Sequence, residues 1–111
     1  MANISTPGSV RGSTLGIIDK KTLDGTTPYV IWETPPRVGT LTVQVAVLSA
    51  GNYRVEITAS PIEDVQSDTA DWFDLFGADQ SQSRQNAIFS SVTAVKVTRV
   101  SGSHRACIRG Q

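Results

Sequence analysis

A strict alternation of apolar and polar side chains between residues 41 and 47 is the feature that most constrains the fold. Its apolar side is formed by Leu41, Val43, Val45 and Val47. A period of two is typical of a strand with one face against a core. The same alternation returns at residues 53–59, after the turn signal Ser49-Ala50-Gly51-Asn52. The two runs therefore predict an antiparallel hairpin with a four-residue connection.

Further β-rich runs follow at short intervals, separated by Gly, Pro and Ser. They lie at residues 29–33, 87–91, 94–100 and 104–109, and a short strand is expected where Trp72 or Phe73 is buried. The runs at 94–100 and 104–109 predict a closing hairpin around Ser101-Gly102-Ser103. No run has the i, i+3, i+4 spacing of a helix. The predicted fold class is all-β: a small antiparallel β-sandwich or barrel.

The apolar residues of these runs form the expected core. Its members are Trp32, Leu41, Val43, Val45, Val47, Tyr53, Val55, Ile57, Trp72, Phe89, Val95, Val97 and Ile108. Residues 1–27 are instead rich in Ser, Thr and Gly, and they bury too little apolar surface to offset their ordering entropy. We predict that residues 1–27 form an extended N-terminal arm and residues 28–111 the β-sandwich domain. The arm is either ordered by a neighbouring subunit or contributes an edge strand near residues 15–18.

Composition excludes several classes of function. The 111 residues include 10 basic and 10 acidic side chains, one cysteine and one histidine. A net charge of zero argues against a general nucleic-acid binder, which needs a basic surface. One cysteine allows no intrachain disulfide and no cysteine zinc site. No stretch reaches the ~18 to 20 apolar residues of a membrane span. Neither nucleic acid nor membrane is therefore an expected partner.

The charges are unevenly distributed along the chain. Residues 63–79 carry only acidic side chains: Glu63, Asp64, Asp68, Asp71, Asp74 and Asp79. From Gln80 onward the charged side chains are all basic: Arg84, Lys96, Arg99, Arg105 and Arg109. Two interpretations stay open, charge balance within one molecule and self-association between complementary surfaces.

Catalytic chemistry has little support in the sequence. His104 follows the turn at 101–103 and is expected to be exposed, and Cys107 lies in an alternating strand as a buried or half-buried structural thiol. There is no G-x-S-x-G nucleophile motif and no glycine-rich phosphate loop. We predict a protein that is not an enzyme and has no cofactor.

Three residue clusters carry a binding alternative beside a structural one. The first cluster could bind calcium or could be solvated loop charges: Asp64, Asp68, Asp71 and Asp74. The second cluster could form a sugar-stacking platform or could pack in the core: Trp32, Tyr53, Trp72 and Phe73. The third cluster could contact phosphates or could belong to a solvated or interface-facing strand surface: Lys96, Arg99, Arg105 and Arg109. In each case the structural interpretation is favoured, and no metal site is predicted.

The order of features from Gly39 to Gln111 resembles small virion proteins of tailed bacteriophages. The resemblance rests on the alternating strands at 43–47 and 53–59, the loop ending in Asp71-Trp72-Phe73, and the run Thr93-Ala94-Val95-Lys96-Val97-Thr98 before the Ser101-Gly102 turn. It implies a capsid decoration or cement protein that bridges major capsid proteins on the outer surface of the virion, after synthesis in the host cytoplasm. Such proteins are often homotrimers.

The arm supplies the expected contacts in that hypothesis. Leu15, Ile17 and Ile18 are predicted to touch the major capsid protein or a neighbouring subunit, by strand addition to an exposed edge. Two alternatives stay open: a neck, tail or head-fibre component of a phage, and a carbohydrate-binding β-sandwich module with an exposed tryptophan.

Overall fold

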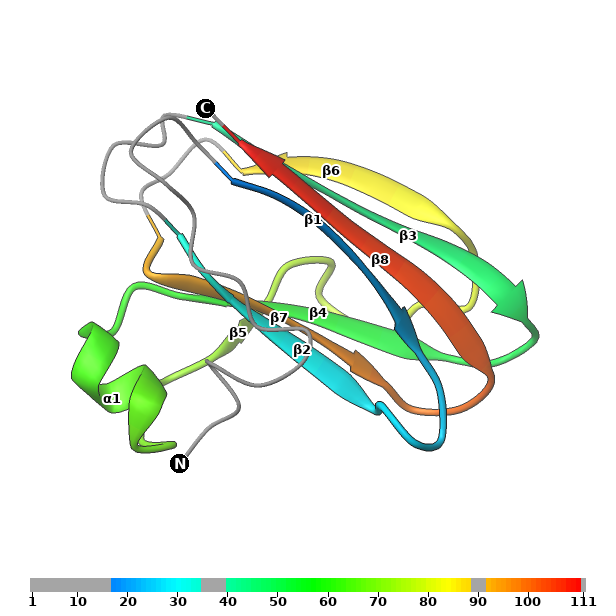
Figure 1. Ribbon diagram of the computed structural model, residues 1–111, viewed down its shortest axis with the longest axis horizontal. Coiled ribbons are helices and arrows are strands. Elements are labelled where there is room, and N and C mark those ends of the chain that lie inside the picture. Colours follow the sequence, from blue (N-terminus) through cyan, green and yellow to red (C-terminus); the bar gives the residue numbers. More distant parts are fainter. Residues whose placement is uncertain (1–16, 35–39, 89–91, 111) are drawn as a thin grey trace.

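The computed structural model describes residues 17–34, 40–88 and 92–110, which form two four-stranded sheets packed face to face (Figure 1). The elements are β1 (Ile17–Leu23), β2 (Tyr29–Glu33), β3 (Leu41–Ser49), β4 (Tyr53–Thr58), α1 (Ile62–Gln66), β5 (Phe73–Asp74), β6 (Arg84–Ile88), β7 (Ala94–Arg99) and β8 (Ser103–Gly110). The first sheet has the order β1-β8-β3-β6 and the second β2-β7-β4-β5. All the pairings are antiparallel. The predicted all-β sandwich is confirmed.

The core lies between the two sheets and follows the predicted alternation. It is formed by Ile17, Leu23, Val30, Trp32, Leu41, Val43, Val45, Tyr53, Val55, Ile88, Val95, Val97, Ala106 and Ile108. Val47 and Ile57 are partly buried against it. Phe89 lies outside the described residues. Trp72 belongs to a second cluster, on the far side of the second sheet.

Both predicted hairpins are wrong. β3 pairs with β8 and β6, whereas β4 pairs with β7 and β5, so the 49–52 turn carries the chain from one sheet to the other. The turn after β7 does the same, because β7 is in the second sheet and β8 is in the first. Alternation fixes which side of a strand is buried, but it does not fix which strand lies beside it.

The two crossing turns pack against each other backbone to backbone. A Cβ atom added to Gly51 would lie 2.1 Å from the carbonyl oxygen of Ser101, and one added to Gly102 would lie 2.5 Å from that of Ala50. Gly102 also has a φ of 71°, in the left-handed region that favours glycine. Glycine is therefore required at both positions by the close approach of the two turns.

The first sheet includes part of the predicted arm. β1 pairs with β8 along its whole length, from Ile17 opposite Gly110 to Leu23 opposite His104. Residues 17–23 thus form an edge strand, whereas residues 1–16 lie outside the described residues. Asp24 then closes the turn to β2, its Oδ1 accepting hydrogen bonds from the backbone N–H groups of Thr26 and Thr27.

A short helix covers the outer face of the second sheet. Val65 of α1 is 1% exposed and packs with Ile31 and Ala94 in a second hydrophobic cluster, flanked by Trp72. The sequence analysis found no helix here, because five residues are too few to show an apolar stripe. After α1 the chain runs to β5, where Phe73 is 66% exposed and Trp72 is the partly buried aromatic residue.

Candidate functional site

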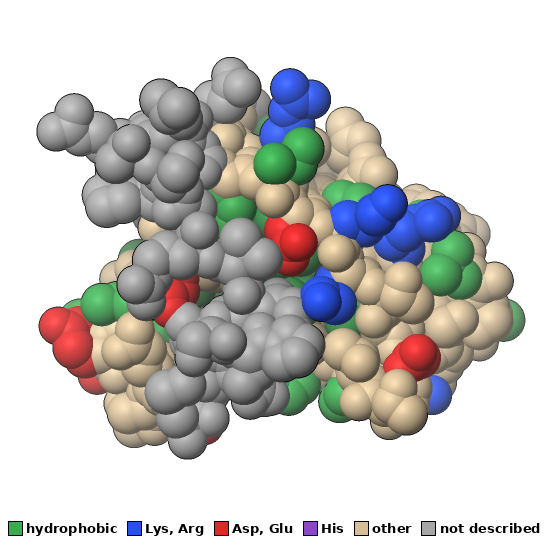
Figure 2. All heavy atoms as spheres, viewed as in Figure 1, with side chains coloured by type: hydrophobic (Ala, Val, Ile, Leu, Met, Phe, Trp, Pro, Cys, Tyr) green, Lys and Arg blue, Asp and Glu red, His purple; other side chains and the backbone are tan. Residues whose placement is uncertain are grey.

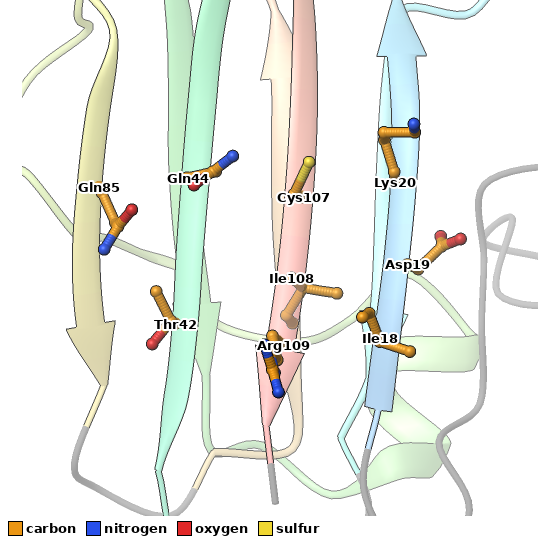
Figure 3. A pocket seen from close by; sticks show the side chains of 9 residues that line it. All are labelled: Ile18, Asp19, Lys20, Thr42, Gln44, Gln85, Cys107, Ile108 and Arg109. Atoms are coloured by element: carbon orange, nitrogen blue, oxygen red, sulfur yellow. The ribbon is translucent and has the colours of Figure 1, made fainter.

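The outer face of the first sheet presents rows of side chains from β1, β8, β3 and β6. Lys20, Cys107, Gln44 and Gln85 lie in one row, because each is paired with the next across the sheet. Ile18, Arg109 and Thr42 form the row on one side, and Thr22, Arg105 and Ala46 the row on the other. Figure 3 shows the first two of these rows across the four strands. We call this surface the basic face.

Three cations surround Cys107 on the basic face. Lys20 is directly opposite Cys107, and Arg105 and Arg109 lie two residues before and after it on β8. Residues two apart on one side of a strand are separated by ~6.5 to 7 Å, and directly opposed residues by ~4.5 to 5.5 Å between Cβ atoms. Lys20, Arg105 and Arg109 are exposed and have no ion pair with any described residue. The face therefore carries three positive charges that are uncompensated within the described ranges.

A hollow of about 610 Å³ lies on this face (Figure 3). It is lined by Ile18, Asp19, Lys20, Thr42, Gln44, Gln85, Cys107, Ile108 and Arg109. Gln44, Gln85 and Thr42 supply amide and hydroxyl groups, and Ile18 supplies an apolar wall that is 74% exposed. The hollow thus combines cations, hydrogen-bonding groups and one apolar side chain.

One carboxylate borders the hollow, but it is engaged with the interior. Asp19 Oδ2 accepts a hydrogen bond of 2.8 Å from Nε1 of Trp32. Trp32 is fully buried, so this bond satisfies the one polar atom of a core side chain. Asp19 keeps its negative charge in this bond, and one carboxylate beside three cations leaves the basic face with an excess of positive charge.

Acidic side chains gather on the opposite side of the sandwich. Those of Glu63, Asp64, Asp68 and Asp71 lie on α1 and on the loop that follows it, over the outer face of the second sheet. They have no ion pair with a cation in the described part of the chain. Figure 2 shows Lys and Arg side chains over β1 and β8 and a group of acidic side chains at α1. We call these four residues the acidic surface.

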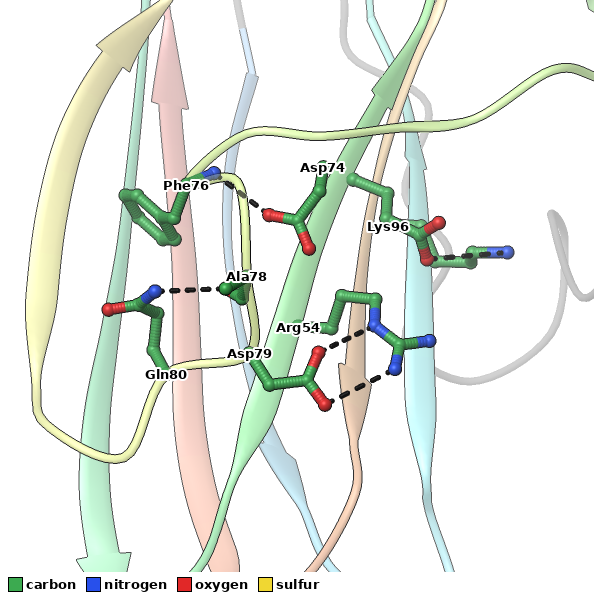
Figure 4. A network of polar contacts seen from close by, with 8 residues as sticks. Arg54, Asp74, Phe76, Ala78, Asp79, Gln80 and Lys96 are labelled. Carbon is green, nitrogen blue, oxygen red and sulfur yellow. Dashed lines mark hydrogen bonds and ion pairs between the residues drawn. The ribbon is translucent and has the colours of Figure 1, made fainter.

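Two cations of the second sheet, Arg54 and Lys96, are compensated by carboxylates (Figure 4). The Arg54 guanidinium contacts the Asp79 carboxylate through two hydrogen bonds of 2.7 and 3.2 Å, and this pairing raises the pKa of Arg54. Lys96 lies 3.9 Å from a Glu56 oxygen and 4.5 Å from the centre of the Trp72 ring. Lys96, which the sequence analysis placed among the exposed basic residues, is therefore half-buried and paired.

Two single-residue predictions have opposite outcomes. His104 is fully buried, not exposed: its Nε2 lies 2.8 Å from the Ser101 carbonyl oxygen, and its ring packs edge-on against Tyr53 with 5.1 Å between centroids. The period of two already places His104 on the same side of β8 as Ala106 and Ile108. Cys107 is half-buried on the outer side of β8, as predicted.

The aromatic residues do not form a sugar platform. Trp32 and Tyr53 are fully buried, and one face of the Trp72 ring is covered by Lys96. Phe73 is exposed alone at the end of the second sheet. The expectation that most of these residues pack in the interior is confirmed for Trp32 and Tyr53, and of the pair Trp72 and Phe73 it is Trp72 that is partly buried.

The remaining predicted site residues are divided between core and surface. Ile17 is 4% exposed and belongs to the core, so its side chain is not available to a partner, whereas Ile18 is exposed at the rim of the hollow. Leu15 lies outside the described residues. Within the described ranges, no three His, Cys, Asp or Glu side chains are grouped to hold a metal ion. No helix in those ranges is long and apolar enough to cross a membrane.

Comparison with known proteins gives similarity to solved structures but no match by sequence. No family model matches the chain, and no curated protein matches it. Among solved structures, the chain is similar to the Drosophila NLP-core, whose crystal structure is described as giving insight into pentamer formation and histone binding. The two share 15% sequence identity over 86% of this chain and 96% of the other, with a TM-score of 0.44. Similarity at this level does not transfer a function.

The comparison does not support the predicted capsid decoration role, which is corrected here: the similar structure is described by pentamer formation and histone binding, and not as a phage protein. The predicted homotrimer and the major capsid protein as partner are corrected with it, as is the alternative of a phage neck, tail or head-fibre component. The carbohydrate-binding alternative required an exposed tryptophan, whereas Trp32 is fully buried and Trp72 is partly buried beneath Lys96. The features that suggested a phage protein were alternating strands and a closing hairpin. Alternating strands occur in β-sandwiches of unrelated function, and here β7 and β8 are not a hairpin.

Proposed function

We propose that this chain is a non-catalytic binding protein whose basic face binds an acidic segment of another protein. The observation that carries the proposal is the gathering of Lys20, Arg105 and Arg109 on one sheet face, where Lys20 and Arg109 line the hollow and the one carboxylate among its lining residues accepts a hydrogen bond from Trp32. Like charges on neighbouring strands repel one another, so this arrangement costs stability unless a partner compensates for it.

The chemistry of the hollow favours a peptide. Carboxylates of the partner pair with the three cations, while Gln44 and Thr42 offer hydrogen bonds and Ile18 contacts an apolar side chain. Each exposed ion pair contributes only about 0.2 to 1 kcal/mol. We therefore expect weak binding that depends steeply on salt, with the charges acting mainly on the association rate.

Two observations support a protein partner and a non-catalytic role. None of the described residues on the basic face is aromatic, so the face lacks the stacking surfaces on which single-stranded nucleic acids bind. The chain has one histidine, His104, and its full burial keeps the imidazole away from any substrate in the hollow. General acid–base chemistry by histidine is therefore not available at this face.

The test is a titration of a fluorescein-labelled peptide of about ten glutamates, followed by anisotropy at low salt. We expect saturable binding that weakens as salt is added. Arg105→Gln with Arg109→Gln should lower the affinity about tenfold, since two ion pairs are lost. Arg54→Gln is the matched control, because it removes a cation on the opposite side of the sandwich, and it should leave the affinity unchanged.

Three results would contradict the proposal. They are an absence of binding at low salt, an equal loss of affinity in the Arg54→Gln control, and tighter binding of a single-stranded oligonucleotide of the same charge. The last result would identify nucleic acid as the partner class. A Gly-Ser peptide of equal length serves as the neutral ligand and should not bind.

A further inference from the structure

The acidic surface and the basic face belong to one molecule but cannot reach each other. α1 packs on the outer face of the second sheet through Val65, whereas Arg105 and Arg109 project from the outer face of the first. Both sheets and the core between them separate the two surfaces. Their opposite charges therefore cannot be paired within one copy of the chain.

We infer that the acidic partner of the basic face is the acidic surface of a second copy, so that the chain associates head to tail. This inference rests on the proposed function and names its partner. Charge complementarity supports it: the three uncompensated cations of one copy face Glu63, Asp64, Asp68 and Asp71 of the next, in a chain whose net charge is zero.

Such a contact joins two different surfaces, so each copy in the assembly uses both. A heterologous contact of this kind closes into a ring where its rotation allows closure, and otherwise it extends into a filament. A two-fold dimer is excluded as the product, because its single interface would have to contain both surfaces of each copy, and these lie on opposite sides of the sandwich. The assembly depends on salt, since the contacts are exposed ion pairs.

Sedimentation equilibrium of the full chain in the presence of reductant tests the inference. At about 0.05 M salt and high micromolar protein we expect a weight-average mass above the monomer mass of 11.9 kDa. Near 1 M salt, where the Debye length is about 3 Å, the mass should return to that of the monomer. Arg105→Glu with Arg109→Glu, and separately Glu63→Lys with Asp71→Lys, should each abolish the association.

Charge swapping separates a lost contact from a lost fold. A chain that carries these four substitutions together with Asp64→Lys has the signs of the two surfaces exchanged, because two new glutamates outweigh Lys20 and three new lysines outweigh Asp68, and it should associate again. An equal mixture of the Arg105→Glu, Arg109→Glu variant and a Glu63→Lys, Asp64→Lys, Asp71→Lys variant should also associate, because the first has two acidic surfaces and the second two basic ones. Thermal melts by circular dichroism confirm that each variant is folded.

The outcomes distinguish this inference from the proposed function. A wild-type chain that stays monomeric at low salt, a double variant that still associates, or a five-fold charge-swapped variant that stays monomeric overturns head-to-tail association. If the labelled glutamate peptide still binds in those cases, the proposed function stands with a different acidic protein as partner. If the peptide fails to bind as well, both are wrong.

Discussion

Asp24 is the residue with the densest set of hydrogen bonds in the turn between β1 and β2. Its Oδ1 accepts bonds from the Thr26 hydroxyl at 2.7 Å and from the backbone N–H groups of Thr26 and Thr27 at 2.8 and 2.9 Å. These donors favour the charged carboxylate and lower the pKa of Asp24 below its ordinary value of 3.8, the Thr26 hydroxyl having the largest effect.

Because that pKa is lower in the folded state than in the unfolded one, the carboxylate adds stability above about pH 4, and the contribution is lost as pH falls through the folded-state pKa. We predict that an NMR titration of the Asp24 carboxyl has its midpoint below 3.8 and that Thr26→Val moves the midpoint upward. Thr22→Val, on the exposed side of β1, is the control and should leave it in place. An identical midpoint in wild type and Thr26→Val would show that the hydroxyl does not set this pKa.

Single residues were predictable where the period of two held. Trp32, Val43, Val55 and Ile108 are buried as expected from their strand positions. The position of His104 directly after a turn predicts an exposed side chain, whereas its place in the alternation of β8 predicts the burial that the structure shows. The hydrogen bond from Trp32 to Asp19 has no sequence signal, since it links β2 to β1, whose residues the composition assigns to an arm.

The strands themselves were largely predictable from sequence, whereas their neighbours were not. The runs at 29–33, 41–47, 53–59 and 94–100 all correspond to strands. Their pairing depends on the turns at 49–52 and 100–103, which carry the chain from one sheet to the other. A short turn that contains glycine can equally join two paired strands of a hairpin, so the turn sequence does not distinguish the two arrangements. β1 was missed as a full strand because Asp19 and Lys21 interrupt its apolar side.

The two crossing turns give a stability prediction at this scale. Gly51→Ala should destabilise the chain by about 1 to 3 kcal/mol, because its new Cβ meets the Ser101 carbonyl oxygen, and the melting temperature should fall by ~4 to 8 °C per kcal/mol. Gly102→Ala should cost a similar amount, since strain at its φ of 71° adds to the close approach to Ala50.

Gly25→Ala is the matched control for both turns. Nothing lies within 4 Å of the position that its Cβ would take, so the added methyl group meets open space. Its melting temperature should stay close to that of the wild type. Equal melting temperatures for Gly51→Ala and Gly25→Ala would mean that the two turns are not packed backbone to backbone.

At the scale of the whole molecule, a net charge of zero is divided between two opposite surfaces. The acidic run at 63–79 and the basic region after Gln80 are visible in the sequence, but only the fold shows which of those charges are compensated. Arg54 with Asp79 and Lys96 with Glu56 form pairs, and Arg105 and Arg109 do not. Lys20 joins the basic face only because β1 pairs with β8, which the sequence did not indicate.

The central claim is that the basic face is a binding surface, and Cys107 is a direct reporter of its occupancy. It is the one cysteine of the chain and lies between Arg105 and Arg109 beside Lys20. Modification of its thiol by the small neutral reagent iodoacetamide, measured by mass spectrometry at high protein dilution, should slow severalfold when the glutamate peptide saturates the face. The Gly-Ser peptide should have no effect, and Arg105→Glu with Arg109→Glu should remove the protection. A modification rate that is unchanged while the peptide is bound would contradict the claim, because the peptide would then occupy another part of the molecule.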